Sequence, residues 1–255
     1  MSENVSENVP ENVAEKAPES LNKTSPDTLP ATLVLLFKRP LPGQGKQRLA
    51  ASLGQARALL LAESFLSCAL EDLAAWQGPV VLAPASIADV DWATELLTRA
   101  RVVPQTGGNL GQRIIALDQQ LRGLGHQQLL YIGSDAPALT TEHYCSAASQ
   151  AEAGVVLSAA DDGGVTLMGS AHPWPAELID LPWSTDQLGN DLAACCHRSG
   201  LSVSYIAPSY DLDIERDLAR LSADLADDDR PARQVLYQLL QTLRLTGACC
   251  TSSST

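Results

Sequence analysis

Aromatic residues and positive charge are both scarce in this 255-residue chain, and each shortage narrows what the protein can be. Aromatic residues make up 4% of the sequence, so Leu, Val and Ala must fill the core. The chain carries 17 Lys and Arg against 30 Asp and Glu, a net charge of −13. Such a surface repels phosphate backbones and anionic lipids. We therefore expect no nucleic-acid partner and no membrane partner, and any phosphate contact must be local.

The sequence also lacks long apolar runs, a signal peptide and cysteine pairs with metal-ligand spacing. No apolar run approaches the ~18 residues that a membrane span needs. The N-terminus is acidic and has no apolar core of the kind found in secretory signals. Six cysteines include no C-x-x-C pair, which argues against a zinc site and fits reduced thiols. These features predict a cytoplasmic protein.

A polar repeat sets the start of the chain apart from the rest. Residues 2–13 repeat a four-residue unit, Ser-Glu-Asn-Val twice and then Pro-Glu-Asn-Val. Few large apolar residues occur before Pro30, so this segment cannot bury enough surface to offset the entropy lost on ordering. We predict a disordered tail over residues 1–30, a single domain over residues 31–245 and a flexible tail over residues 246–255.

Strand-like and helix-like segments alternate within the predicted domain. The apolar run Leu33–Phe37 predicts a strand, and Gln47–Trp76 has helical periodicity that we expect to break near Gly54. The same patterns predict strands over 79–84, 101–105, 128–133, 155–159, 165–169 and 202–206, and helices over 90–99, 110–124, 140–152, 185–199, 215–225 and 232–243. This alternation predicts an α/β protein, a three-layer α/β/α sandwich with a mostly parallel sheet. Ligands bind such sheets at the carboxyl ends of the strands, so functional residues are sought there.

The loop after the first predicted strand gathers positive charge. In an acidic chain, eleven residues hold four cations and two glycines: Lys38, Arg39, Gly43, Gly45, Lys46 and Arg48. An ammonium and a guanidinium on flexible backbone can approach a diphosphate from two sides, and the helix that follows adds free N–H groups. The spacing is not that of a Walker A loop. We predict an anion site formed by this loop, the alternative being a solvated basic turn.

Aspartates follow three other predicted strands. Asp135 ends one strand, where a carboxylate can hold a divalent ion against phosphate, although a turn or helix cap is equally consistent with the local sequence. Asp161 and Asp162 precede two glycines, a pattern that on its own favours a hairpin turn. Asp211 and Asp213 lie close together after a predicted strand, and we expect them to point to opposite faces, so that only one reaches the site. Asp213 could also cap the next helix.

Six short motifs occur in order and together resemble a known family. They are G-K-x-R-L at 45–49, G-x-L-G-x-R at 108–113, G-S-D-x-P at 133–137, D-G-G with L-x-G at 162–169, W-S-T at 183–185 and D-x-D with D-L at 211–218. From about Leu33 to Leu221 the chain resembles a largely uncharacterised bacterial glycosyltransferase-like family of the nucleotide-diphospho-sugar transferase (GT-A) superfamily, some members of which are assigned to arsenosugar biosynthesis. It is distantly similar to 2-phospholactate guanylyltransferase and molybdopterin-guanine dinucleotide synthase. Gln47, Ala136 and Val165 differ from the family's usual Thr, Cys and Tyr.

The resemblance implies a GT-A-like fold and a metal-dependent transferase. It implies that Asp135 and Asp213 hold Mg²⁺ or Mn²⁺, that Lys46 and Arg48 bind phosphates, and that Asp162 contacts the sugar or the acceptor. Asp135 and Asp162 are the expected catalytic residues. The implied partners are a nucleotide sugar or a nucleoside triphosphate, and a small-molecule acceptor. Glycosyl transfer is the first expectation; the alternatives are nucleotidyl transfer with release of pyrophosphate and a non-catalytic nucleotide-binding module.

Overall fold

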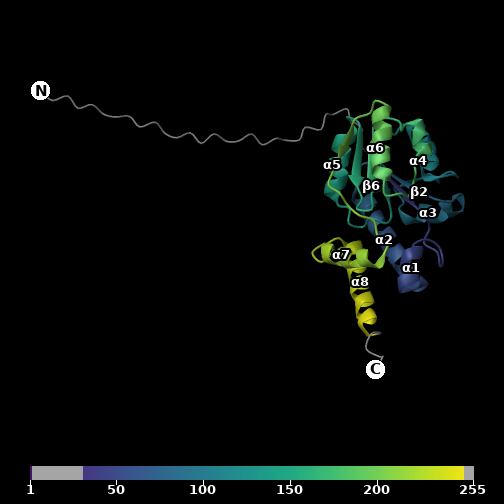
Figure 1. Ribbon diagram of the computed structural model, residues 1–255, viewed down its shortest axis with the longest axis vertical. Coiled ribbons are helices and arrows are strands. Elements are labelled where there is room, and N and C mark those ends of the chain that lie inside the picture. The colour runs from purple at the N-terminus through teal and green to yellow at the C-terminus, as the bar shows by residue number, and fades with distance from the viewer. Residues whose placement is uncertain (2–30, 250–255) are drawn as a thin grey trace.

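A mostly parallel sheet with helices on both faces forms the body of the protein in the computed structural model (Figure 1). The structure describes Met1 and residues 31–249, except for the side chains of 244–249. Apart from Met1, the tail predicted over residues 1–30 lies outside the described residues, and so do residues 250–255 of the predicted C-terminal tail.

The sheet confirms the predicted α/β/α architecture. Among the described residues it has seven strands: β1 (Thr32–Phe37), β2 (Val80–Pro84), β3 (Arg101–Val102), β4 (Leu129–Gly133), β5 (Val155–Ala159), β6 (Val165–Ser170) and β7 (Val203–Tyr205). Their order is β3-β2-β1-β4-β6-β5-β7, and β6 runs antiparallel to its neighbours β4 and β5. The predicted strand over 101–105 is regular only as far as Val102, although the backbone N–H groups of Val103 and Gln105 still donate to the carbonyl oxygens of Leu82 and Pro84, both at 2.9 Å.

The helices follow the predicted pattern closely. They are α1 (Gln47–Leu53), α2 (Gln55–Ala75), α3 (Val90–Leu96), α4 (Leu110–Gly123), α5 (Thr141–Ala151), α6 (Leu188–Arg198), α7 (Glu215–Asp224) and α8 (Pro231–Cys249), with short 3₁₀ helices η1 (Ile87–Asp89) and η2 (Ala176–Asp180). The break between α1 and α2 falls at Gly54, which has φ 86°. Helix α8 continues to Cys249, past the predicted end of this helix at residue 243. None of the helices within the described residues has the length and apolar character to span a membrane.

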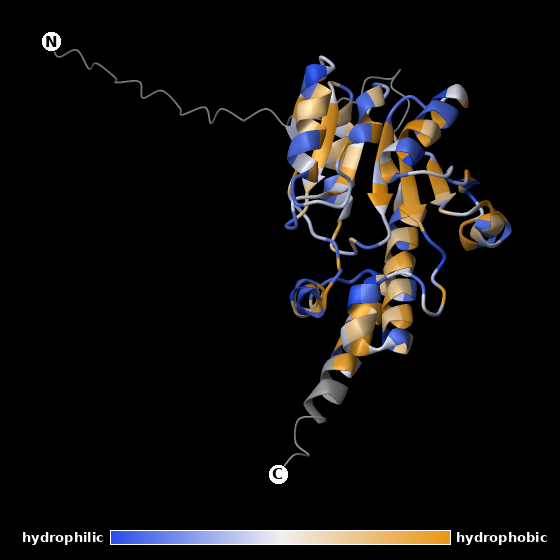
Figure 2. Ribbon diagram, turned by 45° about the vertical axis from the view of Figure 1, so that its right-hand side comes forward, coloured by the Kyte–Doolittle hydropathy of each residue, from blue (hydrophilic) through white to orange (hydrophobic). Residues whose placement is uncertain are grey.

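Apolar side chains form a core on each face of the sheet and a third core beyond the carboxyl ends of the parallel strands. Helices α2, α3 and α5 cover one face, and α4 and α6 cover the other. The third cluster joins α1, α2, α7 and α8 through residues such as Leu49, Phe65, Leu218 and Leu236. Figure 2 shows this helical lobe below the sheet, on the side to which the strand arrowheads point. The carboxyl edge of the sheet therefore faces the helical lobe, and the site lies between them.

A buried ionic network joins α8 to α2 and to the loop that follows β4. The side chain of Arg233 is fully buried, and its guanidinium binds Glu71 at 3.0 Å and Asp72 at 2.5 Å. It also donates to the carbonyl oxygens of Pro137 and Leu139, at 3.3 and 3.5 Å. These two carbonyls belong to the loop that follows β4. Helix α8 is thereby fixed to the segment that carries Asp135.

Candidate functional site

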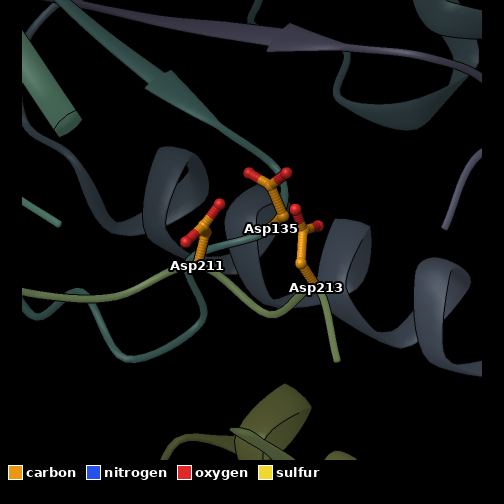
Figure 3. Close-up of side chains that lie close together, drawn as sticks. All are labelled: Asp135, Asp211 and Asp213. Carbon is orange, nitrogen blue, oxygen red and sulfur yellow. The ribbon is translucent and has the colours of Figure 1, made fainter. Parts of the chain in front are cut away.

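Three aspartates converge at the carboxyl edge of the sheet (Figure 3). Asp135 lies two residues after β4, and Asp211 and Asp213 lie between β7 and α7. Each offers one carboxylate oxygen, and the three oxygens lie within 4.8 Å of one another. The backbone N–H of Leu212 donates to the carbonyl oxygen of Asp135 at 3.0 Å, which holds the two segments together. The fold thus brings together residues that are more than 70 positions apart in the sequence.

The expectation that Asp211 and Asp213 point to opposite faces is wrong. In extended backbone, residues two positions apart lie on the same face, and the residue between them points the other way. Leu212 is fully buried in the core of the helical lobe, and both aspartates face Asp135. Asp211 is therefore a member of the site that was not expected from the sequence. The alternating spacing of D-x-D was itself the signal that would have found it.

Lys46 and Arg48, both from the basic loop, bring positive charge to this cluster. The Nζ atom of Lys46 lies 3.2 Å from Oδ2 of Asp135 and 3.0 Å from Oδ1 of Asp213. Nη1 of Arg48 lies 3.5 Å from the other oxygen of Asp213, and its side chain is 75% exposed. Burial disfavours the charge on Lys46, but the charges of Asp135 and Asp213 and their hydrogen bonds outweigh it, so the pKa of Lys46 is raised. The ammonium stays charged.

Left-handed backbone gives the basic loop its shape. Gly43 and Gly45 have φ 73° and 68°, and Lys46 itself has φ 41° and ψ 41°. A residue with a side chain adopts this conformation at a cost, which indicates that the loop is built to place Lys46. The side-chain amide of Gln47 donates to the carbonyl oxygens of Gly43 and Gly45, at 3.0 and 3.2 Å, and closes the loop. Gln47, one of the departures from the family pattern, thus has a structural role.

Arg39 lies elsewhere in the loop. Its Nη1 atom is 3.7 Å from Asp89, and its guanidinium lies 4.8 Å from the centre of the Trp92 ring. These contacts pair Arg39 with η1 and α3 and not with the three aspartates. Its contact with phosphate stays a prediction.

Asp162 closes the turn between the antiparallel strands β5 and β6, as the hairpin interpretation predicted. Its Oδ1 atom accepts a hydrogen bond from the backbone N–H of Gly164 at 2.9 Å. Gly163 has φ 85°, and a Cβ atom there would lie 1.8 Å from the carbonyl oxygen of Asp186, so only glycine fits. The carboxylate of Asp162 is exposed and lies outside the group of three. Its catalytic role stays a prediction.

The site holds more negative charge than its cations balance. Burial raises the pKa of Asp211 to about 6, and the charges of Asp162, Asp135 and Asp213 add to this shift. A further cation among the three carboxylates would relieve the repulsion. An all-oxygen donor set is the kind that Mg²⁺ and Mn²⁺ prefer. The residues present therefore fit a divalent ion.

Gly133 allows Asp135 its position. A Cβ atom on Gly133 would lie 2.5 Å from Oδ1 of Asp135. We expect Gly133→Ala to displace this carboxylate and to weaken Mn²⁺ binding in the presence of nucleotide by on the order of tenfold, measured by calorimetry. Gly123→Ala is the control, because a Cβ atom there has no neighbour within 4 Å. Equal Mn²⁺ affinities for the two variants would contradict the role given to Asp135.

Comparisons with known proteins agree with this fold. Residues 68–185 match the family model described as "Uncharacterized protein conserved in bacteria (DUF2064)". The structure is similar to that of a protein from Desulfovibrio desulfuricans G20 described as a nucleotide-diphospho-sugar transferase, with a TM-score of 0.75 and 23% identity over 84% of this chain and 97% of that chain. It is also similar to 4-diphosphocytidyl-2C-methyl-D-erythritol synthase, with a TM-score of 0.51 and 12% identity over 77% of this chain and 99% of that chain. No curated protein matches the sequence.

The matched segment contains Asp135 and Asp162, whereas Lys46, Asp211 and Asp213 lie outside it and join the site through the fold. The resemblance inferred from the six motifs is thereby confirmed: the protein has the nucleotide-diphospho-sugar transferase fold and, over residues 68–185, matches the bacterial family DUF2064.

Proposed function

We propose that the protein is a divalent-metal-dependent transferase that uses a nucleotide-activated donor, with a nucleotide sugar as the first candidate. The convergence of Asp135, Asp211 and Asp213, two of which contact Lys46, carries this proposal. It occurs at the carboxyl edge of the sheet, where open α/β folds bind their ligands. The similarity in fold to a protein described as a nucleotide-diphospho-sugar transferase supports the same donor class.

Each charged group has a part in this proposal. The three aspartates would hold Mg²⁺ or Mn²⁺, and the bound ion would supply positive charge to the donor's phosphate oxygens. Lys46 would contact the same oxygens as a point charge, and Arg48 would contact them as a planar fork. During glycosyl transfer, negative charge grows on the departing nucleoside diphosphate, and Lys46 and Arg48 would stabilise it together with the bound ion. Asp162 is exposed at the neighbouring hairpin and would contact the sugar or the acceptor.

Nucleotidyl transfer is the second candidate. It is favoured by the likeness to a synthase that makes a diphosphocytidyl compound. The same cations would then stabilise attack on the α-phosphate of a nucleoside triphosphate, with pyrophosphate as the leaving group. The released product distinguishes the two reactions: a nucleoside diphosphate in the first and pyrophosphate in the second.

A thermal-shift panel of UDP-, GDP- and ADP-sugars and nucleoside triphosphates, with and without Mn²⁺, tests the proposal. A donor present at 100 times its Kd adds about 2.7 kcal/mol to the stability of the folded state. We therefore expect at least one donor to raise Tm by roughly 5–10 °C, and only with Mn²⁺. Product analysis with that donor then identifies the reaction. No shift with any donor, or the same shift without Mn²⁺, would contradict a metal-dependent donor site, and binding without product would indicate a non-catalytic module.

A further inference from the structure

The ammonium of Lys46 contacts two of the three carboxylates that would hold the proposed metal ion. It is shared between Oδ2 of Asp135 and Oδ1 of Asp213, and its side chain is only 13% exposed. Resting on the function proposed above, we infer that Lys46 is the counter-ion of these carboxylates as long as no metal is bound. When metal and donor enter, Lys46 leaves the carboxylates for the donor's phosphates, and the metal takes its place. This exchange would make metal binding depend on the donor.

The geometry makes the two cations competitors. A divalent ion approaches carboxylate oxygens to roughly 2.0–2.3 Å. An ion on either oxygen that Lys46 now contacts at 3.0–3.2 Å would lie no more than about 5.5 Å from the ammonium. Like charges at this separation repel strongly in a partly buried site, where water screens them poorly. The metal and the ammonium therefore weaken each other's binding when both contact Asp135 and Asp213.

The basic loop gives Lys46 the means to move. The loop residues on either side of Lys46 are exposed, and Gly43 and Gly45 adopt left-handed backbone. The closing hydrogen bonds from Gln47 are also exposed. A donor phosphate offers the ammonium a new charged partner at the moment it gives up the carboxylates. Because linkage is reciprocal, a donor that removes Lys46 strengthens metal binding, and a metal that displaces Lys46 strengthens donor binding.

A neutral side chain at position 46 should have opposite effects on metal binding and on phosphate binding. Lys46→Met should bind Mn²⁺ alone about tenfold more tightly than the wild type, because the competing charge is gone. The same variant should bind inorganic pyrophosphate, without metal, about tenfold more weakly. Loss of the Mn²⁺ electron paramagnetic resonance signal reports metal binding, and calorimetry reports pyrophosphate binding. Lys46→Gln gives a second neutral side chain should the first variant fold poorly.

Arg198→Met is the control. It removes one positive charge from the exposed C-terminal end of α6, outside the site, and Arg198 makes no ion pair with any residue that the structure describes. Its Mn²⁺ affinity should equal that of the wild type. If Mn²⁺ affinity is unchanged or lower in both Lys46 variants while the wild type binds Mn²⁺ with a donor, the exchange is overturned and the proposed function stands. If no protein binds Mn²⁺ even with a donor, both proposals are overturned.

Discussion

Asp135→Asn should lower the transfer rate by on the order of a thousandfold. The substitution removes the negative charge of the carboxylate that follows β4, and the proposed ion then loses an anionic ligand. Folding should be affected little, because the side chain of Asp135 is 41% exposed and exposed ion pairs contribute little stability. The measurement is the initial rate with the donor that binds, together with Tm.

Asp91→Asn provides the control for this prediction. It makes the same chemical change on an exposed position of α3, outside the site, and its rate should match that of the wild type. An Asp135→Asn protein that keeps more than about a tenth of the wild-type rate would remove Asp135 from the catalytic machinery.

Arg233→Met should cost about 3 kcal/mol of folding stability, because removing one partner of a buried ion pair leaves the other charge buried and less well compensated. The carboxylate that loses its partner is Asp72, whose side chain is 5% exposed and which, among the described residues, keeps only Arg230 as a cationic partner, at 3.0 Å. Urea unfolding measures the loss. Adding Asp72→Asn should recover part of it, since the buried carboxylate charge is then gone.

Arg216→Met is the control, because it measures how much stability is lost when an exposed arginine is replaced in the same way. Arg216 is 85% exposed and contacts its neighbour Asp217 at 3.8 Å, so its removal should change stability by less than about 0.5 kcal/mol. A loss below about 1 kcal/mol for Arg233→Met would show that α8 is not anchored through this network.

Much of the fold could be predicted from the sequence because local signals were strong. Leu33–Phe37 is continuously apolar, as a central parallel strand must be, and Gly54 marked the break between α1 and α2. Features without periodicity escaped prediction. The helices η1 and η2 are too short to show a repeating pattern, and α6 begins at Leu188, three residues after the predicted start.

Part of the candidate site carried local signals, and the rest depends on contacts between distant segments. Asp135 and Lys46 each carried a local signal, a strand end and a basic loop. The meeting of Asp135 with Asp213 was implied by the family resemblance and not by any local pattern, since Asp213 is 167 positions from Lys46. The contact between Arg39 and Trp92 likewise could not be predicted from local sequence patterns.

Arg233 carried a signal in the sequence that was not recognised as one. It shares the apolar stripe of α8 with Leu236 and Leu240, at spacings of three and seven residues, and all three are buried. A charged residue on the buried face of a helix requires a buried partner of opposite charge. The partner, Asp72, lies on α2 and could not be identified without the structure.

Asp135, Asp211 and Asp213 should form a donor-dependent metal site. The most direct test is the anomalous scattering of Mn²⁺ in crystals grown with Mn²⁺ and the donor that gives the largest thermal shift. We predict a peak at roughly 2.0–2.3 Å from an oxygen of Asp135 and from an oxygen of Asp211 or Asp213, with Lys46 moved onto the phosphates. A bound donor with Lys46 still between Asp135 and Asp213, and with no Mn²⁺ on these carboxylates, would show that they are not the metal site.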